Sequence, residues 1–160
     1  MTMSRHCTTV FDIANTGYSA WPMVAIAAGV TVLLTLVFVI ISRLRPLPLT
    51  AWIGPVIGGT VALGLFSSTW SEYRNALTVL KTGRYETVEG PIESFVAEPL
   101  TGHSEESFTV AGNRFHYGTY VMTPGFHLSR ARGGPFAQGL YVRLRFRGND
   151  ILYAEVCDGE

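Results

Sequence analysis

The chain has 160 residues with twelve acidic and twelve basic side chains, so its formal net charge is zero. A neutral chain has no overall field that would attract nucleic acid, and we expect no nucleic-acid partner. Charged residues make up only 15% of the chain, against about 25% in ordinary soluble domains. They are missing from residues 13–42 and 46–71, so an apolar part precedes a part of ordinary composition.

Residues 1–21 are a mostly polar N-terminal tail, and two uncharged runs follow it, residues 22–41 and 51–70. Each run is long enough for a helix that crosses the hydrocarbon core of a bilayer, which takes about 20 residues. Neither run has the polar stripe of a helix that packs in a soluble core. We therefore predict a transmembrane α-helical hairpin over residues 22–70, in contact with membrane lipids.

The elbow 42–48, SRLRPLP, joins the two runs. Its prolines disfavour helix in the residues before them, so the chain turns there and both termini lie on one side of the membrane. Arg43 and Arg45 outweigh the distant Arg5, and basic residues favour the cytoplasmic side. This pattern predicts a cytoplasmic elbow with both termini outside. The basic residues of 74–84 leave the opposite orientation open.

Small residues recur at a spacing of four in the second run, at Gly54, Gly58 and Ala62, and in the first run at Ala25 and Gly29. Such a strip lets another helix approach closely. It indicates either docking of a partner or a second copy, or packing within the hairpin itself. Neither run contains an ionisable residue, so an ion path or proton relay through these helices is not expected.

Residues 71–83, SEYRNALTVLKTG, predict an amphipathic helical stem that continues the second run into water. Gly83 is a suitable stop for this helix. An apolar stripe on a helix in water is stable only when it is buried against another surface, so we expect the stem to pack on the domain that follows. The stripe consists of Tyr73, Ala76, Leu77 and Leu80.

From residue 84 to 160 the pattern is that of β-strands, and we predict a small all-β domain. The first strand, YETVEGPIESFV, alternates between an apolar and an acidic face, with Gly90-Pro91 as a bulge or an edge position. The apolar face holds Val88, Ile92 and Val96, and the acidic face holds Glu89 and Glu93.

Two hairpins follow the first strand, with predicted two-residue turns at Gly112-Asn113 and Gly148-Asn149. Five strands in about 75 residues fit an OB-like five-stranded barrel, with an SH3-like roll as the alternative. The loop 123–139 stands where an OB fold usually has a helix. The predicted register pairs Phe108 with Tyr117, Val110 with Phe115, Leu144 with Tyr153, and Phe146 with Ile151.

Arg143, Arg145 and Arg147 alternate along one strand and therefore share one face. This face is suited to lipid headgroups or an anionic ligand. The alternative is a solvated outer face balanced by acids such as Asp150, which lies opposite Arg147 in the predicted register.

The loop 123–139 carries His127, Arg130 and Arg132 among several glycines and prolines. A loop of this length in a small domain is usually functional or mobile, so it predicts either a partner-binding or ligand-binding segment or a flexible connection. It lacks the Gly-Lys-Ser/Thr ending of a phosphate-binding loop.

No motif in the chain indicates catalysis, and we expect no enzyme, no metal and no cofactor. The nucleophile elbow G-x-S-x-G is missing. The polar residues His103, Glu105, Glu106, His116 and His127 match no metal-ligand spacing.

Cys7 and Cys157 are the two cysteines of the chain. Two spans put both in the same compartment, so they are able to pair if that compartment is oxidising. The pairing stays open, because no sequence pattern places residue 7 near the last strand.

The segments VEGPIESF, ESFTVAGNRFHY, TPGF, GGP and GLYVRLRFRGNDILYAEV, over residues 73–156, resemble a group of bacterial two-span membrane proteins with a C-terminal β domain. The architecture is also similar to that of NfeD-like proteins. The first resemblance implies bacterial origin. Together with the two predicted spans and the cytoplasmic elbow, it leads us to expect an inner-membrane protein whose termini and β domain lie in the periplasm. We expect a non-enzymatic assembly or accessory subunit that binds a larger membrane protein, or a second copy, through the hairpin and β domain. A ligand-sensing or lipid-binding module is the alternative.

Overall fold

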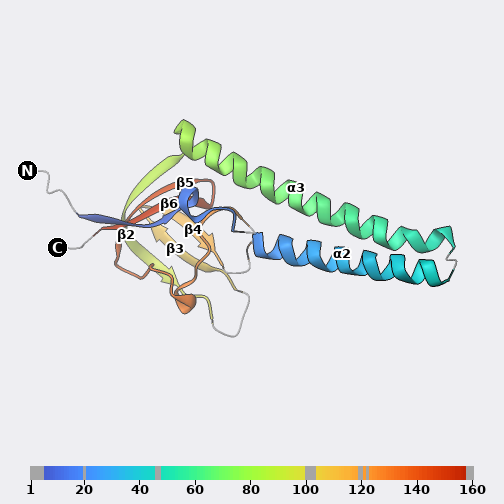
Figure 1. The fold of residues 1–160 in the computed structure, drawn as a ribbon. Helices are drawn as coiled ribbons and strands as arrows, with labels where there is room; N and C mark the ends of the chain where they lie inside the picture. Colours follow the sequence, from blue (N-terminus) through green and yellow to red (C-terminus); the bar gives the residue numbers. More distant parts are fainter. Residues whose placement is uncertain are drawn as a thin grey trace, which may run out of the picture. The chain divides into compact units, whose positions relative to one another are not determined.

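A computed structural model describes residues 6–19, 21–45, 48–99, 104–118, 121 and 123–157 (Figure 1). The chain forms two compact units. One unit combines Met1–Gly17 with Glu72–Glu160, and the other is Tyr18–Ser71. Helix α3 contributes to both units, because it runs without a break from Ile53 to Thr82.

The unit Tyr18–Ser71 contains helix α2 (Trp21–Leu44), the short 3-10 helix η1 (Leu49–Trp52) and the first part of α3. Both long helices are long and apolar enough to cross a membrane, and the apolar windows that define them have no buried residue. This arrangement agrees with the predicted helical hairpin. Two edge-on aromatic pairs lie in this unit. Tyr18, which precedes α2, pairs with Trp70 of α3, and Phe38 of α2 pairs with Trp52 of η1, at centroid distances of 5.4 and 4.9 Å.

The other unit is built on one antiparallel sheet with the strand order β1-β6-β5-β2-β3-β4. Its strands are β1 (Cys7–Asp12), β2 (Glu86–Val96), β3 (Glu106–Val110), β4 (Asn113–Tyr117), β5 (Tyr141–Arg147) and β6 (Asp150–Cys157). The sheet is open, so neither the predicted OB-like barrel nor the SH3-like roll is confirmed.

Pairing along β6 shows why the sheet stays open. Strand β1 pairs with β6 from Tyr153 to Cys157, and Phe126 of the loop donates its backbone N–H to the Ile151 carbonyl at 2.9 Å. The edge of β6 is therefore occupied, and β4 does not pair with it. Instead His116 of β4 exchanges hydrogen bonds with the side chain of Asn149 in the β5–β6 turn.

Strand β1 corrects the description of residues 1–21 as a tail. After β1, Asp12 caps the short helix α1 (Ile13–Thr16) by accepting a hydrogen bond from the Ala14 backbone N–H at 2.9 Å. Ile13, only 1% exposed, enters the core of the β unit. The sheet thus has six strands rather than five, and the first comes from before the helical hairpin.

Strand β2 is long enough to pair with two different strands along its length. Its first half, Glu86–Pro91, pairs with β5 and its second half, from Ile92, pairs with β3. Val88 and Ile92 are buried as predicted, but the register shifts between Ile92 and Ser94. This irregularity leaves Val96 57% exposed, so its predicted place on the apolar face is wrong.

The first hairpin turns one residue earlier than predicted. Its turn residues are Ala111 and Gly112, both with positive φ, as a type I′ turn requires. Phe108 therefore pairs with Phe115, and Glu106 pairs with Tyr117. Shifting the turn by one residue moves every partner by two, so the same side chains still face the core.

The second hairpin has the predicted turn, and Phe146 pairs with Ile151 and Arg147 with Asp150. Beyond this point the register shifts, and Leu144 pairs with Ala154 instead of the predicted Tyr153. The irregularity allows the consecutive residues Ile151 and Leu152 to be buried together.

The last turns of α3 form the stem and pack on the β unit. Ala76 and Val79 are buried, and the other apolar side chains of the predicted stripe are partly buried against the same core. Gly83 and Arg84 donate their backbone N–H groups to the carbonyls of Leu80 and Val79. This Schellman arrangement ends the helix where the sequence predicted.

The core is rich in aromatic rings, and the loop 123–139 contributes two of them. Phe126 and Phe136 are buried and lie 4.8 Å apart between ring centroids. They contact Phe108 and Tyr117 of the first hairpin. The loop is therefore part of the folded core rather than a flexible connection across it.

Candidate functional site

The buried carboxylate of Glu106 holds the loop 123–139 in place. Its two oxygens accept the backbone N–H of Arg130 at 3.3 and 3.0 Å, and one of them accepts the Tyr117 hydroxyl. The Glu98 backbone N–H also donates to the Glu106 carboxylate, at 3.4 Å. Burial, followed by the hydrogen bond to Glu106, raises the pKa of Tyr117 above its ordinary range, so the phenol stays protonated as a donor.

The centre of the loop is wound tightly around one carbonyl group. The Ser129 carbonyl accepts the backbone N–H groups of Arg132 and Gly134, each at 2.9 Å. Residues Arg130–Arg132 form the short 3-10 helix η2 inside this winding. A Cβ atom at Gly134 would lie 2.2 Å from the Leu128 carbonyl oxygen, so only glycine fits.

The three predicted loop residues are placed by local contacts. His127 Nδ1 is 2.9 Å from the Gly125 carbonyl oxygen. The guanidinium of Arg130 lies over the Phe95 ring, 5.9 Å from its centroid. Arg132 is exposed on η2. Neither of the two cavities described below is lined by any of the three.

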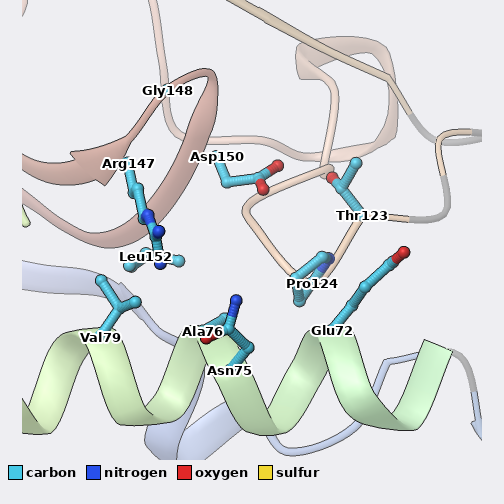
Figure 2. A pocket seen from close by; sticks show the side chains of 10 residues that line it. All are labelled: Glu72, Asn75, Ala76, Val79, Thr123, Pro124, Arg147, Gly148, Asp150 and Leu152. Atoms are coloured by element: carbon cyan, nitrogen blue, oxygen red, sulfur yellow. The ribbon is translucent and has the colours of Figure 1, made fainter. Parts of the chain in front are cut away.

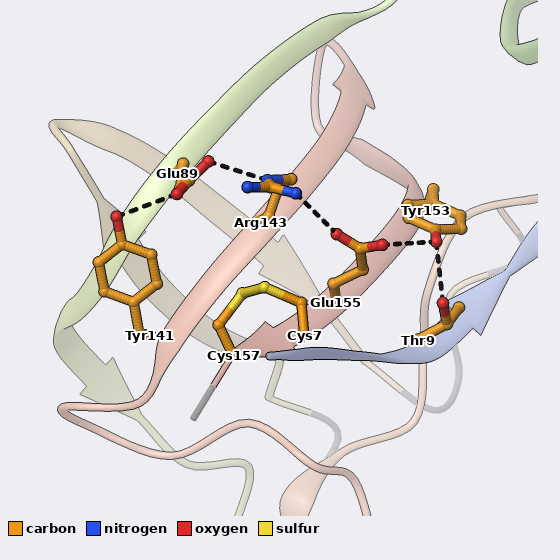
Figure 3. The surroundings of a disulfide bond; sticks show 8 residues. All are labelled: Cys7, Thr9, Glu89, Tyr141, Arg143, Tyr153, Glu155 and Cys157. Carbon is orange, nitrogen blue, oxygen red and sulfur yellow. Dashed lines mark hydrogen bonds and ion pairs between the residues drawn. A yellow bond between two sulfur atoms is a disulfide. The ribbon is translucent and has the colours of Figure 1, made fainter. Parts of the chain in front are cut away.

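The predicted arginine face is largely engaged within the sheet (Figure 3). Arg143 pairs with Glu89 at 2.8 Å and with Glu155 at 3.4 Å. The hydrogen bond to Glu89 is the main cause that raises the pKa of Arg143. Arg145 lies over the rings of Tyr85 and Tyr153, at 5.4 and 4.6 Å. These contacts favour the balanced outer face over a headgroup site at these two positions.

Hydrogen bonds extend this polar face into a row of side chains across four strands, which we call the outer polar row. Thr9 of β1 contacts the hydroxyl of Tyr153 at 2.8 Å, and that hydroxyl donates to Glu155 at 2.8 Å. At the other end of the row, the Tyr141 hydroxyl donates to Glu89 at 3.2 Å. Figure 3 shows the row running beside the disulfide that joins Cys7 of β1 to Cys157 of β6.

Arg147 lies apart from this row, at a groove between the stem and the β5–β6 turn (Figure 2). The groove has a volume of about 560 Å³, within the 300–1,000 Å³ that is usual for small-ligand sites. Its polar side chains are those of Glu72, Asn75, Thr123, Arg147 and Asp150, and its apolar ones those of Ala76, Val79, Pro124 and Leu152.

Asp150 is a half-buried carboxylate that lines this groove. Burial raises its pKa, a hydrogen bond with Thr123 works in the opposite direction, and the negative charge of Glu72 raises it further. The ion pairs found in the described part of the chain join Arg143 to its two glutamates, and none joins Arg147 to Asp150 or Glu72. The groove therefore presents two carboxylates and a guanidinium that have no ionic partners within the described structure.

A second cavity, of about 360 Å³, lies between α2 and α3. Gly54 and Gly58 of the predicted strip line it, together with apolar side chains such as Leu34 and Phe38. A methyl group added at either glycine would meet no atom within 4 Å. The glycines are thus not used for close packing within the hairpin. Ala62 is half-buried and does not line the cavity.

The described residues contain no group of three or more His, Cys, Asp and Glu side chains able to hold a metal ion. Of the residues considered for such a group, Glu106 holds the loop and His116 is tied to Asn149 through its backbone. His103 lies outside the described residues.

Comparisons with known proteins give no assignment. No protein-family model, no curated protein and no solved structure matches the chain.

The groove beside the stem is the feature that sequence reasoning missed. The sequence predicts that Arg147 and Asp150 oppose each other, but Glu72, Asn75 and Thr123 come from other segments and share no sequence pattern with them. Only the adjacent apolar residues Ile151 and Leu152, which break the alternation of β6, signalled that this end of the hairpin has a second buried side.

Proposed function

We propose that the chain is a non-enzymatic accessory or assembly subunit of a bacterial inner membrane. In this proposal the helical hairpin docks beside a helix of a larger membrane protein, and the β unit stands in the periplasm, where it contacts the same partner. A second copy of the chain is the other occupant that the small-residue strip would accept.

The observation that carries the proposal is the uncovered glycine surface of the hairpin. Gly54 and Gly58 border a cavity that no described residue fills. Membrane helices associate by close packing at such small residues. The described residues of the β unit expose only two large hydrophobic side chains, Val96 and Leu128. The hairpin is therefore the better candidate for the main contact, with the β unit adding polar contacts.

The disulfide supports the proposed orientation. Disulfides persist in oxidising compartments such as the periplasm and are rare in the cytosol. Cys7 precedes the first span and Cys157 follows the second, so both lie on one side of the membrane. A bond between them favours the outer side, in agreement with the bias of Arg43 and Arg45 in the elbow.

The substitution Gly58→Leu tests the docking surface. A leucine fills the cavity, so a partner crosslinked in native membranes should be lost or strongly reduced. Gly64→Leu is the matched control, because Gly64 is also exposed in α3 with no atom within 4 Å of an added Cβ, but it does not line the cavity. If both variants retain the crosslinked partner at the wild-type level, the docking proposal is wrong.

A further inference from the structure

We propose that the groove between the stem and the β5–β6 turn binds a zwitterionic group, a primary ammonium carried beside a phosphate. The ethanolamine headgroup of a phospholipid has this chemistry, and so does free phosphoethanolamine. The choice of a lipid as the source of this ligand rests on the proposed function, in which the chain is anchored in a membrane. The match between the groove and a zwitterionic group does not depend on that proposal.

Glu72 and Asp150 form the ammonium side of the site. Figure 2 shows Glu72 rising from the stem to end below Thr123, and Asp150 directed toward Thr123 from the β5–β6 turn. Each negative charge disfavours the other, as the effect of Glu72 on the pKa of Asp150 shows. A cation between them removes that repulsion, and a primary ammonium offers three N–H donors to the carboxylate oxygens.

Arg147 forms the phosphate side. Figure 2 shows its guanidinium directed into the groove above Leu152. Arginine binds phosphate through two parallel N–H donors, and the Asn75 side chain on the stem supplies a further donor. Ala76, Val79 and Leu152 make an apolar floor beneath these groups, which suits the methylene groups between the amine and the phosphate.

Glu72 begins the part of helix α3 that belongs to the β unit. Glu72 follows Trp70 by two residues in the same helix, a rise of about 3 Å. Tryptophan favours the interface between headgroups and hydrocarbon. A lipid that is anchored with its phosphate at this level therefore carries its headgroup within reach of Glu72.

Native mass spectrometry of the full-length protein released from nanodiscs tests the proposal. The lipids to compare are phosphatidylethanolamine, phosphatidylcholine and phosphatidylglycerol. We expect preferential retention of phosphatidylethanolamine, because choline has no N–H donor and glycerol has no cation. Asp150→Asn and Arg147→Gln should each weaken this retention by about tenfold, the effect of losing one charge-assisted contact.

Glu93→Gln and Arg114→Gln are matched controls, since both residues are exposed on the β unit and neither lines the groove. They should retain the lipid like the wild type, and melting curves should show that all four variants are folded. Equal retention of the three lipids, or equal losses in groove and control variants, overturns the proposal.

A separate titration with free phosphoethanolamine distinguishes the two sources of the ligand. Competition with the retained lipid at micromolar concentration assigns the groove to a soluble zwitterion, whereas no competition assigns it to the lipid. Partner crosslinking of Asp150→Asn should remain at the wild-type level, so that failure of the headgroup site and failure of the docking surface give different results.

Discussion

Cys7 and Cys157 lie directly opposite each other on neighbouring strands and are joined by a disulfide, although 150 positions separate them in the chain. The loop that this bond closes includes both apolar helices. The bond thus fastens the strand before the hairpin to the last strand after it. The β unit thus combines segments from before and after the hairpin, and the disulfide links them where β1 pairs with β6.

Replacing both cysteines by alanine should destabilise the β unit without changing its fold. Removing a disulfide typically costs about 2–4 kcal/mol, mainly because the unfolded chain gains freedom. We expect a lower urea midpoint for Cys7→Ala/Cys157→Ala, and the same midpoint for reduced wild-type protein. A reduced wild type that unfolds at the midpoint of the oxidised protein would show that the bond contributes nothing to stability.

Cysteine labelling in intact cells checks the proposed orientation. A cysteine at Ala97, an exposed position of the β unit, should react with a membrane-impermeant thiol reagent. A cysteine at Ser42, next to the basic elbow, should react only after the cells are permeabilised. The reverse pattern would place the β unit in the cytoplasm, where the disulfide would not persist.

The elements with long, uniform patterns could be predicted from the sequence. The two apolar helices, the stem with its stop at Gly83 and the second turn at Gly148-Asn149 depend on local signals. Strand β1 could not be predicted, because it is short and buries only Phe11 among its described side chains. Its pairing depends on β6, which lies at the opposite end of the chain.

The candidate groove was less predictable than the fold for a similar reason. Its charged residues come from the stem and the β5–β6 turn, and Thr123 comes from a third segment. Their meeting depends on the irregularity that buries Leu152 beside Ile151, because Leu152 lines the groove together with Val79 of the stem. Register shifts of this kind result from tertiary packing, and they hardly change the alternation of apolar and polar residues along a strand.

The substitution Gly134→Ala should disrupt the loop 123–139. The added Cβ would lie 2.2 Å from the backbone oxygen of Leu128, so the winding around the Ser129 carbonyl must open. We expect a clear loss of thermal stability and faster hydrogen exchange at the Arg132 and Gly134 amides. Gly118→Ala is the matched control, because its Cβ would meet its nearest atoms at an ordinary 3.6 Å. Equal stability of the two variants would contradict the tight winding.

Tyr117 should make the β unit sensitive to alkaline pH. Burial and the bond to Glu106 raise the pKa of its phenol, whereas an exposed tyrosine in the unfolded chain titrates near pH 10. Above that pH the unfolded chain releases a proton that the folded chain keeps. The unfolded state is therefore favoured increasingly, and the free energy of unfolding should fall as pH rises above about 10.

The variant Tyr117→Phe should lose stability at pH 7, by about 1.5–3 kcal/mol for a hydrogen bond to a charged group. It should also show a shallower fall in stability between about pH 10 and 11, because the group that causes part of this fall is gone. Tyr153→Phe is the matched control, since it removes a hydroxyl from the outer polar row and leaves Tyr117 in place. Urea unfolding of the three proteins at several pH values measures both effects, and an equally steep alkaline fall in all three would exclude Tyr117 as its source.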